Sequence, residues 1–114
     1  MFTATVERTI TAAHHNGPEG HKCNTNHGHD WRAIVTVEYG DEDLNANGWG
    51  PDFGAIKAVL DRYDHQDLNE LLPFPPSAEN FAKHLYREIW TATSFTPSRV
   101  ELYEGHDNRV AYTE

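Results

Sequence analysis

The sequence is poor in sulfur and lacks any long apolar run. Among its 114 residues there is one methionine and one cysteine, Cys23. A single cysteine cannot form an internal disulfide, so its thiol is either an inert buried side chain or a chemically active group. No run of about 18 apolar residues is present, which predicts that no helix crosses a membrane. The first residues also lack a basic stretch followed by an apolar one, so we expect no export signal and a cytoplasmic location.

Basic residues are scarce as well. Nine Lys and Arg stand against eighteen Asp and Glu, which gives a formal net charge of -9. Binding to a nucleic-acid backbone needs a basic stripe, and none is visible, so we expect neither nucleic acid nor a membrane as a partner. The length fits one domain spanning residues 1–114.

Apolar residues follow two periodicities along the chain. Alternation of apolar and polar residues predicts strands over 2–13 and 31–39, with a long loop between them that carries Cys23. Apolar residues at three- and four-residue intervals predict two helices, the first over about 52–63 with Asp52 as N-cap. The second helix follows Ser77 and runs to about residue 92, and two short strands at about 99–104 and 109–113 complete the chain.

This order of elements, ββααββ, predicts an α+β fold. It indicates a four-stranded antiparallel sheet with both helices packed on one face. Such an open sheet has two free edges, which proteins usually pair or cover. We therefore expect a homo-oligomer that forms by edge pairing.

Histidine is abundant, and five of the eight histidines lie between residues 14 and 29. His27 and His29 are two residues apart where the loop meets the second strand, so their side chains point to the same side. His14 ends the first strand and lies beside this pair if the two strands are neighbours. Three imidazoles with an open fourth position are typical of a catalytic zinc site, although other first-row ions also bind such a set.

Other interpretations of these residues stay open. The two histidines around Gly28 could be exposed loop residues, and Cys23 could be a fourth ligand that closes a structural zinc site in a non-catalytic protein. Alternatively Cys23 is a base, because nearby imidazoles and a metal lower the pKa of a thiol. His15 is expected to face solvent on the opposite side from His14, and His21 is expected on the loop surface.

Two further groups are candidates for proton transfer and binding. Asp64 and His65 could form a relay in which the carboxylate fixes the imidazole tautomer, although such pairs more often cap a helix. Glu104 ends a strand, with Glu101 on the opposite face. A carboxylate within a pocket could bind the amino-imine edge of a heterocycle by paired hydrogen bonds.

Six segments of the chain form a recognisable series, and they include the motifs C-x3-H-G-H and D-H-x-x-L-N. These segments are residues 12–14, 22–29, 52–57, 64–69, 76–80 and 100–104. In order and spacing, along nearly the whole chain, they resemble the 6-pyruvoyl-tetrahydropterin synthase superfamily. Within the superfamily, the short spacing between Cys23 and His27 is similar to bacterial 6-carboxy-tetrahydropterin synthases of queuosine and other 7-deazaguanine biosynthesis.

The resemblance implies a fold and an assembly. The fold would be the tunnelling fold (T-fold), in which subunits pair edge strands into a barrel and two rings stack as a hexamer, a dimer of trimers. Its substrate would be 7,8-dihydroneopterin triphosphate. The products would be 6-carboxy-tetrahydropterin, acetaldehyde and triphosphate. The alternative within the superfamily is formation of a 6-pyruvoyl product by elimination of triphosphate alone.

The resemblance also implies roles for individual residues. Zn²⁺ would be bound by His14, His27 and His29. Cys23 would be the catalytic base, and Asp64 and His65 would form the second proton-transfer group. Glu104 would anchor the pterin.

The chain departs from the family pattern at a few positions. Ile10 stands where Phe is usual, which is a packing change, and Gly105 follows Glu104 where Thr or Ser is common, which bears on the pterin edge. The acidic chain must offset the charge of a triphosphate with a local cation, such as Lys22 or one from a neighbouring subunit.

Overall fold

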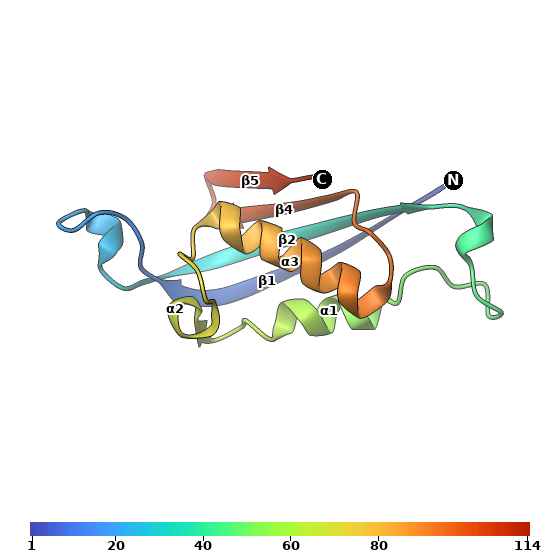
Figure 1. Cartoon of the computed structure of the whole chain (residues 1–114), viewed down its shortest axis with the longest axis horizontal. Helices are drawn as coiled ribbons and strands as arrows, with labels where there is room; N and C mark the ends of the chain where they lie inside the picture. The colour runs from blue at the N-terminus through green and yellow to red at the C-terminus, as the bar shows by residue number, and fades with distance from the viewer.

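The computed structural model describes all 114 residues. The chain forms five strands, three α-helices and two 3₁₀ turns, and its layout is shown in Figure 1. The strands are β1 (Phe2–His14), β2 (His27–Tyr39), β3 (Gln66–Asp67), β4 (Arg99–Glu104) and β5 (Asn108–Tyr112). The helices are α1 (Phe53–Asp61), α2 (Leu68–Leu71) and α3 (Ala78–Thr93), and the 3₁₀ turns are η1 (Lys22–Asn24) and η2 (Asp41–Asp43).

The sheet has the order β3-β1-β2-β4-β5. The four long strands pair antiparallel, as predicted, but the prediction of four strands and two helices was incomplete. Residues 66–67 add a fifth strand that pairs parallel to β1, and α2 adds a third helix. Both additions depend on the segment after α1 docking against β1, a long-range contact that leaves no periodic pattern in so short a stretch of sequence.

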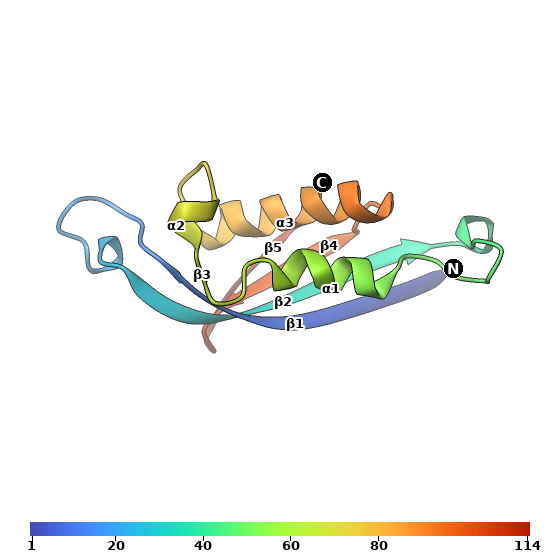
Figure 2. The ribbon, with the colours of Figure 1, turned by 90° about the horizontal axis from the view of Figure 1, so that it is seen from below.

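The helices cover one face of the sheet. Figure 2 shows α1 and α3 on the same side of β1 and β2. Each long helix begins where the sequence predicts, because the Asp52 side chain caps Gly54 and Ala55 and the Ser77 hydroxyl caps Asn80. The core between the layers consists of alternate strand residues and the apolar stripes of the helices, with Trp31, Phe81 and Ile10 among its largest fully buried side chains.

Strand pairing fixes the end of the sheet where the histidines lie. β1 and β2 pair over their whole lengths, from Phe2 opposite Tyr39 to His14 opposite His27. The second strand therefore begins four residues earlier than the alternation alone indicates, at His27 rather than Trp31. The loop between β1 and β2 projects beyond the helices at one end of the molecule (Figures 1 and 2).

The two edges of the sheet are formed by segments of different length. β3 pairs only with Ala12 and Ala13, so most of the outer edge of β1 has no neighbouring strand, and β5 forms the other edge. Within one chain the sheet is open. None of the helices is long and apolar enough to cross a membrane.

Candidate functional site

Three histidines converge at the end of the β1–β2 pair. His14 lies opposite His27, and Ala12 lies opposite His29, so the strand register brings the three side chains to one side of the sheet. Their potential ligand atoms all lie within 4.8 Å of one another. The side chain of His14 is buried, at 5% exposure, and the other two are half-buried. We call these three residues the histidine cluster.

Backbone carbonyls orient two of these rings. His14 Nδ1 lies 2.7 Å from the carbonyl oxygen of Pro76, and His27 Nδ1 lies 2.6 Å from that of Thr25. Only a protonated ring nitrogen donates to a carbonyl, so in both rings Nδ1 carries the proton and the Nε2 lone pair is free. Metal-binding histidines are commonly oriented in this manner.

The free ring nitrogens supply a test of whether the cluster fits a metal. Nε2 of His14 and Nε2 of His29 are buried and have no hydrogen-bond partner. Buried polar nitrogens without a partner are costly, and a metal ion would satisfy them. Burial lowers the pKa of His29, as do His14 and His27, against the opposing effect of Glu104. Neutral imidazoles are the form that binds metal, so the residues present fit Zn²⁺.

A buried tryptophan packs against two rings of the histidine cluster. The Trp31 ring makes edge contacts with His14 at a centroid distance of 4.9 Å and with His29 at 5.5 Å. Its indole N–H donates to the carbonyl of Ala12, at 3.2 Å. Because Trp31 is completely buried, it holds the two rings against the core.

Glu104 lies next to the histidine cluster. It pairs with Trp31 across the β2–β4 ladder, and its Oε1 is 3.3 Å from Nε2 of His29, without the alignment of a hydrogen bond. A cavity of about 180 Å³ adjoins this carboxylate, between the first turn of α3 and the start of β5. A carboxylate that lines a cavity beside the cluster is a candidate binding group for a polar ligand.

Asp64 and His65 form the pair that the sequence suggests. His65 Nδ1 lies 3.0 Å from Asp64 Oδ2, and the other carboxylate oxygen accepts a hydrogen bond from the Thr11 N–H at 2.8 Å. That bond from Thr11 is the main cause of the lowered pKa of Asp64. The two side chains are in contact although they are adjacent in sequence. They are exposed, at 39% for Asp64 and 80% for His65.

Cys23 occupies the projecting loop, in the 3₁₀ turn η1, and its side chain is half-exposed. His21 begins this turn, since its Nδ1 accepts the Cys23 N–H at 3.1 Å, and it lies on the surface as expected. The thiol is not among the ligand atoms gathered in the histidine cluster. No hydrogen bond or ion pair within the chain joins Cys23, Asp64 or His65 to the cluster.

The prediction that His15 is simply a solvated neighbour was wrong. Asn69 bonds both the N–H and the carbonyl of His15, and its Nδ2 lies 3.3 Å from His15 Nε2. This bridge ties the end of β1 to α2, and it leaves His15 half-buried. A contact over 54 residues has no local signal in the sequence.

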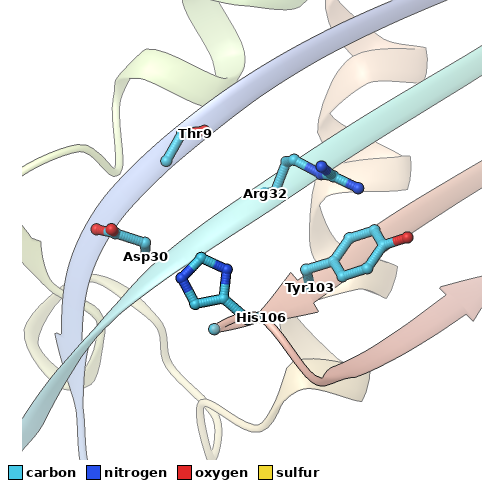
Figure 3. A pocket seen from close by; sticks show the side chains of 6 residues that line it. Thr9, Asp30, Arg32, Tyr103 and His106 are labelled. Carbon is cyan, nitrogen blue, oxygen red and sulfur yellow. The ribbon is translucent and has the colours of Figure 1, made fainter.

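A second polar cavity, of about 230 Å³, lies on the helix-free face of the sheet. Figure 3 shows Asp30 and Arg32 on β2, Tyr103 on β4 and His106 in the following turn around it. The Arg32 guanidinium lies 4.2 Å above the centre of the Tyr103 ring. Strand alternation separates these side chains from the histidine cluster, which faces the helices.

Sequence reasoning missed three supports of the cluster. They are the carbonyls of Thr25 and Pro76 and the ring of Trp31. The position of Trp31, two residues after His29 in the same strand, is the one signal that could have indicated its contact with the histidines. Carbonyls carry no residue-type signal, so the other two could not have been found.

Comparisons with known proteins agree on one family. The family described as 6-pyruvoyl tetrahydropterin synthase matches residues 3–114. A Halobacterium salinarum protein named as a probable 6-carboxy-5,6,7,8-tetrahydropterin synthase is 30% identical, over 88% of this chain and 84% of that protein. An Archaeoglobus fulgidus protein named as a putative 6-carboxy-5,6,7,8-tetrahydropterin synthase is also 30% identical, over 87% of this chain and 85% of its own length.

Solved structures show the same fold. The structure of Caenorhabditis elegans 6-pyruvoyl tetrahydropterin synthase superposes with a TM-score of 0.76 at 23% identity, and the match covers 100% of this chain and 97% of that one. A Plasmodium falciparum 6-pyruvoyl tetrahydropterin synthase gives a TM-score of 0.65 at 15% identity, over 98% of both chains. The predicted T-fold is therefore confirmed for the subunit.

Proposed function

The chain belongs to the 6-pyruvoyl tetrahydropterin synthase family, and we propose that it is a zinc-dependent 6-carboxy-5,6,7,8-tetrahydropterin synthase, a carbon–carbon lyase. Its substrate would be 7,8-dihydroneopterin triphosphate, and its products 6-carboxy-tetrahydropterin, acetaldehyde and triphosphate, within 7-deazaguanine (queuosine) biosynthesis. The names of the two 30%-identical relatives support this activity. The observation that carries it is the histidine cluster, with its two unpartnered Nε2 atoms, beside the Glu104 carboxylate.

In this proposal His14, His27 and His29 hold Zn²⁺ through their Nε2 atoms, and Glu104 holds the substrate. When bound, Zn²⁺ supplies Lewis acidity toward the hydroxyl groups of the substrate side chain. The Glu104 carboxylate accepts two hydrogen bonds from the amino-imine edge of the pterin, which fixes the ring beside the cluster.

Cys23 and the Asp64–His65 pair would move protons. The Asp64 carboxylate holds the proton of His65 on Nδ1, which leaves Nε2 of His65 to accept or donate a proton. The Cys23 thiolate would act as the base that removes a proton from the substrate side chain. Two separate proton-transfer groups suit a reaction that moves hydrogen between the ring and its side chain.

Assembly is part of the proposal. No hydrogen bond or ion pair joins Cys23, Asp64 or His65 to the histidine cluster of their own chain, and both edges of the sheet are free. Pairing of these edges in a homo-oligomer, a hexamer built as a dimer of trimers, would give such exposed groups a route to the cluster of a neighbouring copy.

Product analysis tests the proposed reaction. The purified zinc-loaded protein should release acetaldehyde and triphosphate in equal amounts from 7,8-dihydroneopterin triphosphate. Release of triphosphate with a 6-pyruvoyl product and no acetaldehyde would assign the chain to the pyruvoyl-forming activity instead. Stoichiometric zinc without any turnover would support a zinc-stabilised binding protein.

A further inference from the structure

A hydrogen-bonded cluster joins the end of α1 to the middle of α3, away from the histidine cluster. The Tyr63 hydroxyl donates to Oε1 of Glu88, and His84 Nε2 lies 2.6 Å from the same oxygen and 3.0 Å from the Tyr63 hydroxyl. The Arg62 guanidinium contacts Oε2 of Glu88 at 2.9 Å. The Tyr63 ring is buried, and the Glu88 side chain is 20% exposed. We call these four residues the tyrosine anchor.

The pKa shifts of Glu88 and Tyr63 indicate which of the two groups carries the proton. Burial acts to raise the pKa of Glu88, but the hydrogen bonds from His84 and Tyr63, together with the charge of Arg62, lower it below its usual value. Burial and the hydrogen bond to Glu88 raise the pKa of Tyr63. At neutral pH the phenol is therefore the donor and the carboxylate the acceptor, which is a strong, charge-assisted arrangement.

Tyr63 directly precedes the Asp64–His65 pair. The turn that carries this pair leaves α1 and reaches β3, and His65 within it has a φ of 59°, a left-handed conformation unusual for a residue with a side chain. Such a conformation persists only where the surroundings hold it. β1 holds the turn from one side, because the His65 N–H donates to the Thr11 carbonyl at 2.6 Å and Asp64 accepts the Thr11 N–H.

The tyrosine anchor holds the same turn from the helix side. The Tyr63 ring packs on Phe81 at 5.2 Å, and Phe81 packs on Trp31 at 5.5 Å. Trp31 in turn contacts His14. A continuous row of buried rings therefore links the turn with the Asp64–His65 pair to the histidine cluster, so both parts are fixed to one rigid core.

We propose that Tyr63 and Glu88 are positioning residues, which hold the turn so that the Asp64–His65 pair keeps the geometry needed for proton transfer. This inference rests on the proposed function, in which His65 transfers a proton. Neither residue touches the substrate in this proposal, and both act through the turn that follows Tyr63. A small displacement of a proton-transfer group lowers the rate far more than it lowers binding.

Tyr63→Phe tests the proposal, because it removes the hydroxyl and keeps the ring on Phe81. We expect kcat to fall about tenfold, with KM and bound zinc within twofold of the wild type. Tyr86→Phe is the matched control. Tyr86 is also buried, lies on α3 and has no hydrogen bond to its hydroxyl, so its kcat should equal that of the wild type. Glu88→Gln, which weakens the same contact, should give a smaller loss and serves as the test if Tyr63→Phe does not fold.

Combining Tyr63→Phe with His65→Ala separates a positioning role from general destabilisation. If Tyr63 acts through the pair, Tyr63→Phe should change the residual kcat of His65→Ala by less than twofold. The same tenfold loss on both backgrounds, or no loss in the wild type, would overturn the positioning role. A wild-type kcat for His65→Ala itself would overturn the proposed role of His65, and the positioning role with it.

Discussion

The histidine cluster and the proposed proton-transfer groups are built in different ways. In the cluster His14 is buried and the other two histidines are half-buried, carbonyls orient two of the three rings, and a fully buried tryptophan packs against it. The side chain of His65, by contrast, is 80% exposed at the sheet edge, and Cys23 lies in the projecting loop. One chain therefore brings together the three proposed metal ligands by itself.

The difference indicates that the histidines are fixed by the sheet, whereas Cys23 is positioned by its loop. Strand register determines the positions of His14, His27 and His29, and register is strongly specified wherever one face of a sheet is buried. Cys23 is held by contacts within the projecting loop, in which its N–H donates to the His21 ring and its carbonyl accepts the Asn16 N–H. We expect substitutions in the two parts to separate metal binding from turnover.

The largest effect is expected from His14→Ala. It removes one of the three proposed ligands from a buried position, so zinc affinity should fall more than about a hundredfold, beyond the loss expected from altering a supporting residue. Turnover should fall at least about a thousandfold, because the Lewis acid is lost with the ligand. Zinc content after dialysis, measured by atomic absorption, and steady-state kinetics check this prediction.

His15→Ala is the control for that substitution. The backbone contacts of residue 15 with Asn69 remain in this variant, and only the weak contact of the ring is lost. Zinc content should stay stoichiometric and kcat within about threefold of the wild type. Full zinc retention in His14→Ala would contradict the proposed ligand set.

The next largest effect is expected from Cys23→Ala, which should lower turnover without changing zinc binding. General acid–base groups contribute about 10²- to 10⁴-fold, so we expect kcat to fall within that range. Zinc should remain bound, since the thiol is not among the atoms gathered in the histidine cluster. Loss of zinc together with activity would make Cys23 a ligand and would remove the contrast between the two regions.

Much of the fold follows from local patterns in the sequence. Alternation predicts β1 and β4 within a residue or two, and the caps at Asp52 and Ser77 mark the starts of the long helices. β3 could not be predicted, because a two-residue strand exists only through its pairing with Ala12 and Ala13. The start of β2 was placed too late because polar and glycine residues at 27–30 hide the alternation.

The candidate site, like the fold, is only partly predictable from the sequence. The convergence of His27 and His29 follows from their spacing, and the approach of His14 follows once β1 and β2 are taken as neighbours. The surroundings of Glu104 depend on the β2–β4 register, which places it opposite Trp31 and beside His29. No periodicity gives that register, so the distance from Glu104 to the cluster could not be derived from the chain alone.

The smallest effect is expected from Trp31→Phe, which probes the contact between the rigid core and the histidine cluster. The change removes the hydrogen bond to the Ala12 carbonyl and leaves a small void, so the free energy of unfolding should fall by about 2 kcal/mol. Zinc affinity should fall about tenfold, because the ring that packs on His14 and His29 no longer fixes them fully.

Trp90→Phe, at an exposed position on α3, is the matched control and should change neither quantity. Denaturant unfolding of the metal-free protein and competition with a zinc chelator measure the two effects separately. A loss of stability with unchanged zinc affinity would mean that Trp31 serves the core alone, and that the carbonyls of Thr25 and Pro76 are sufficient to orient the rings.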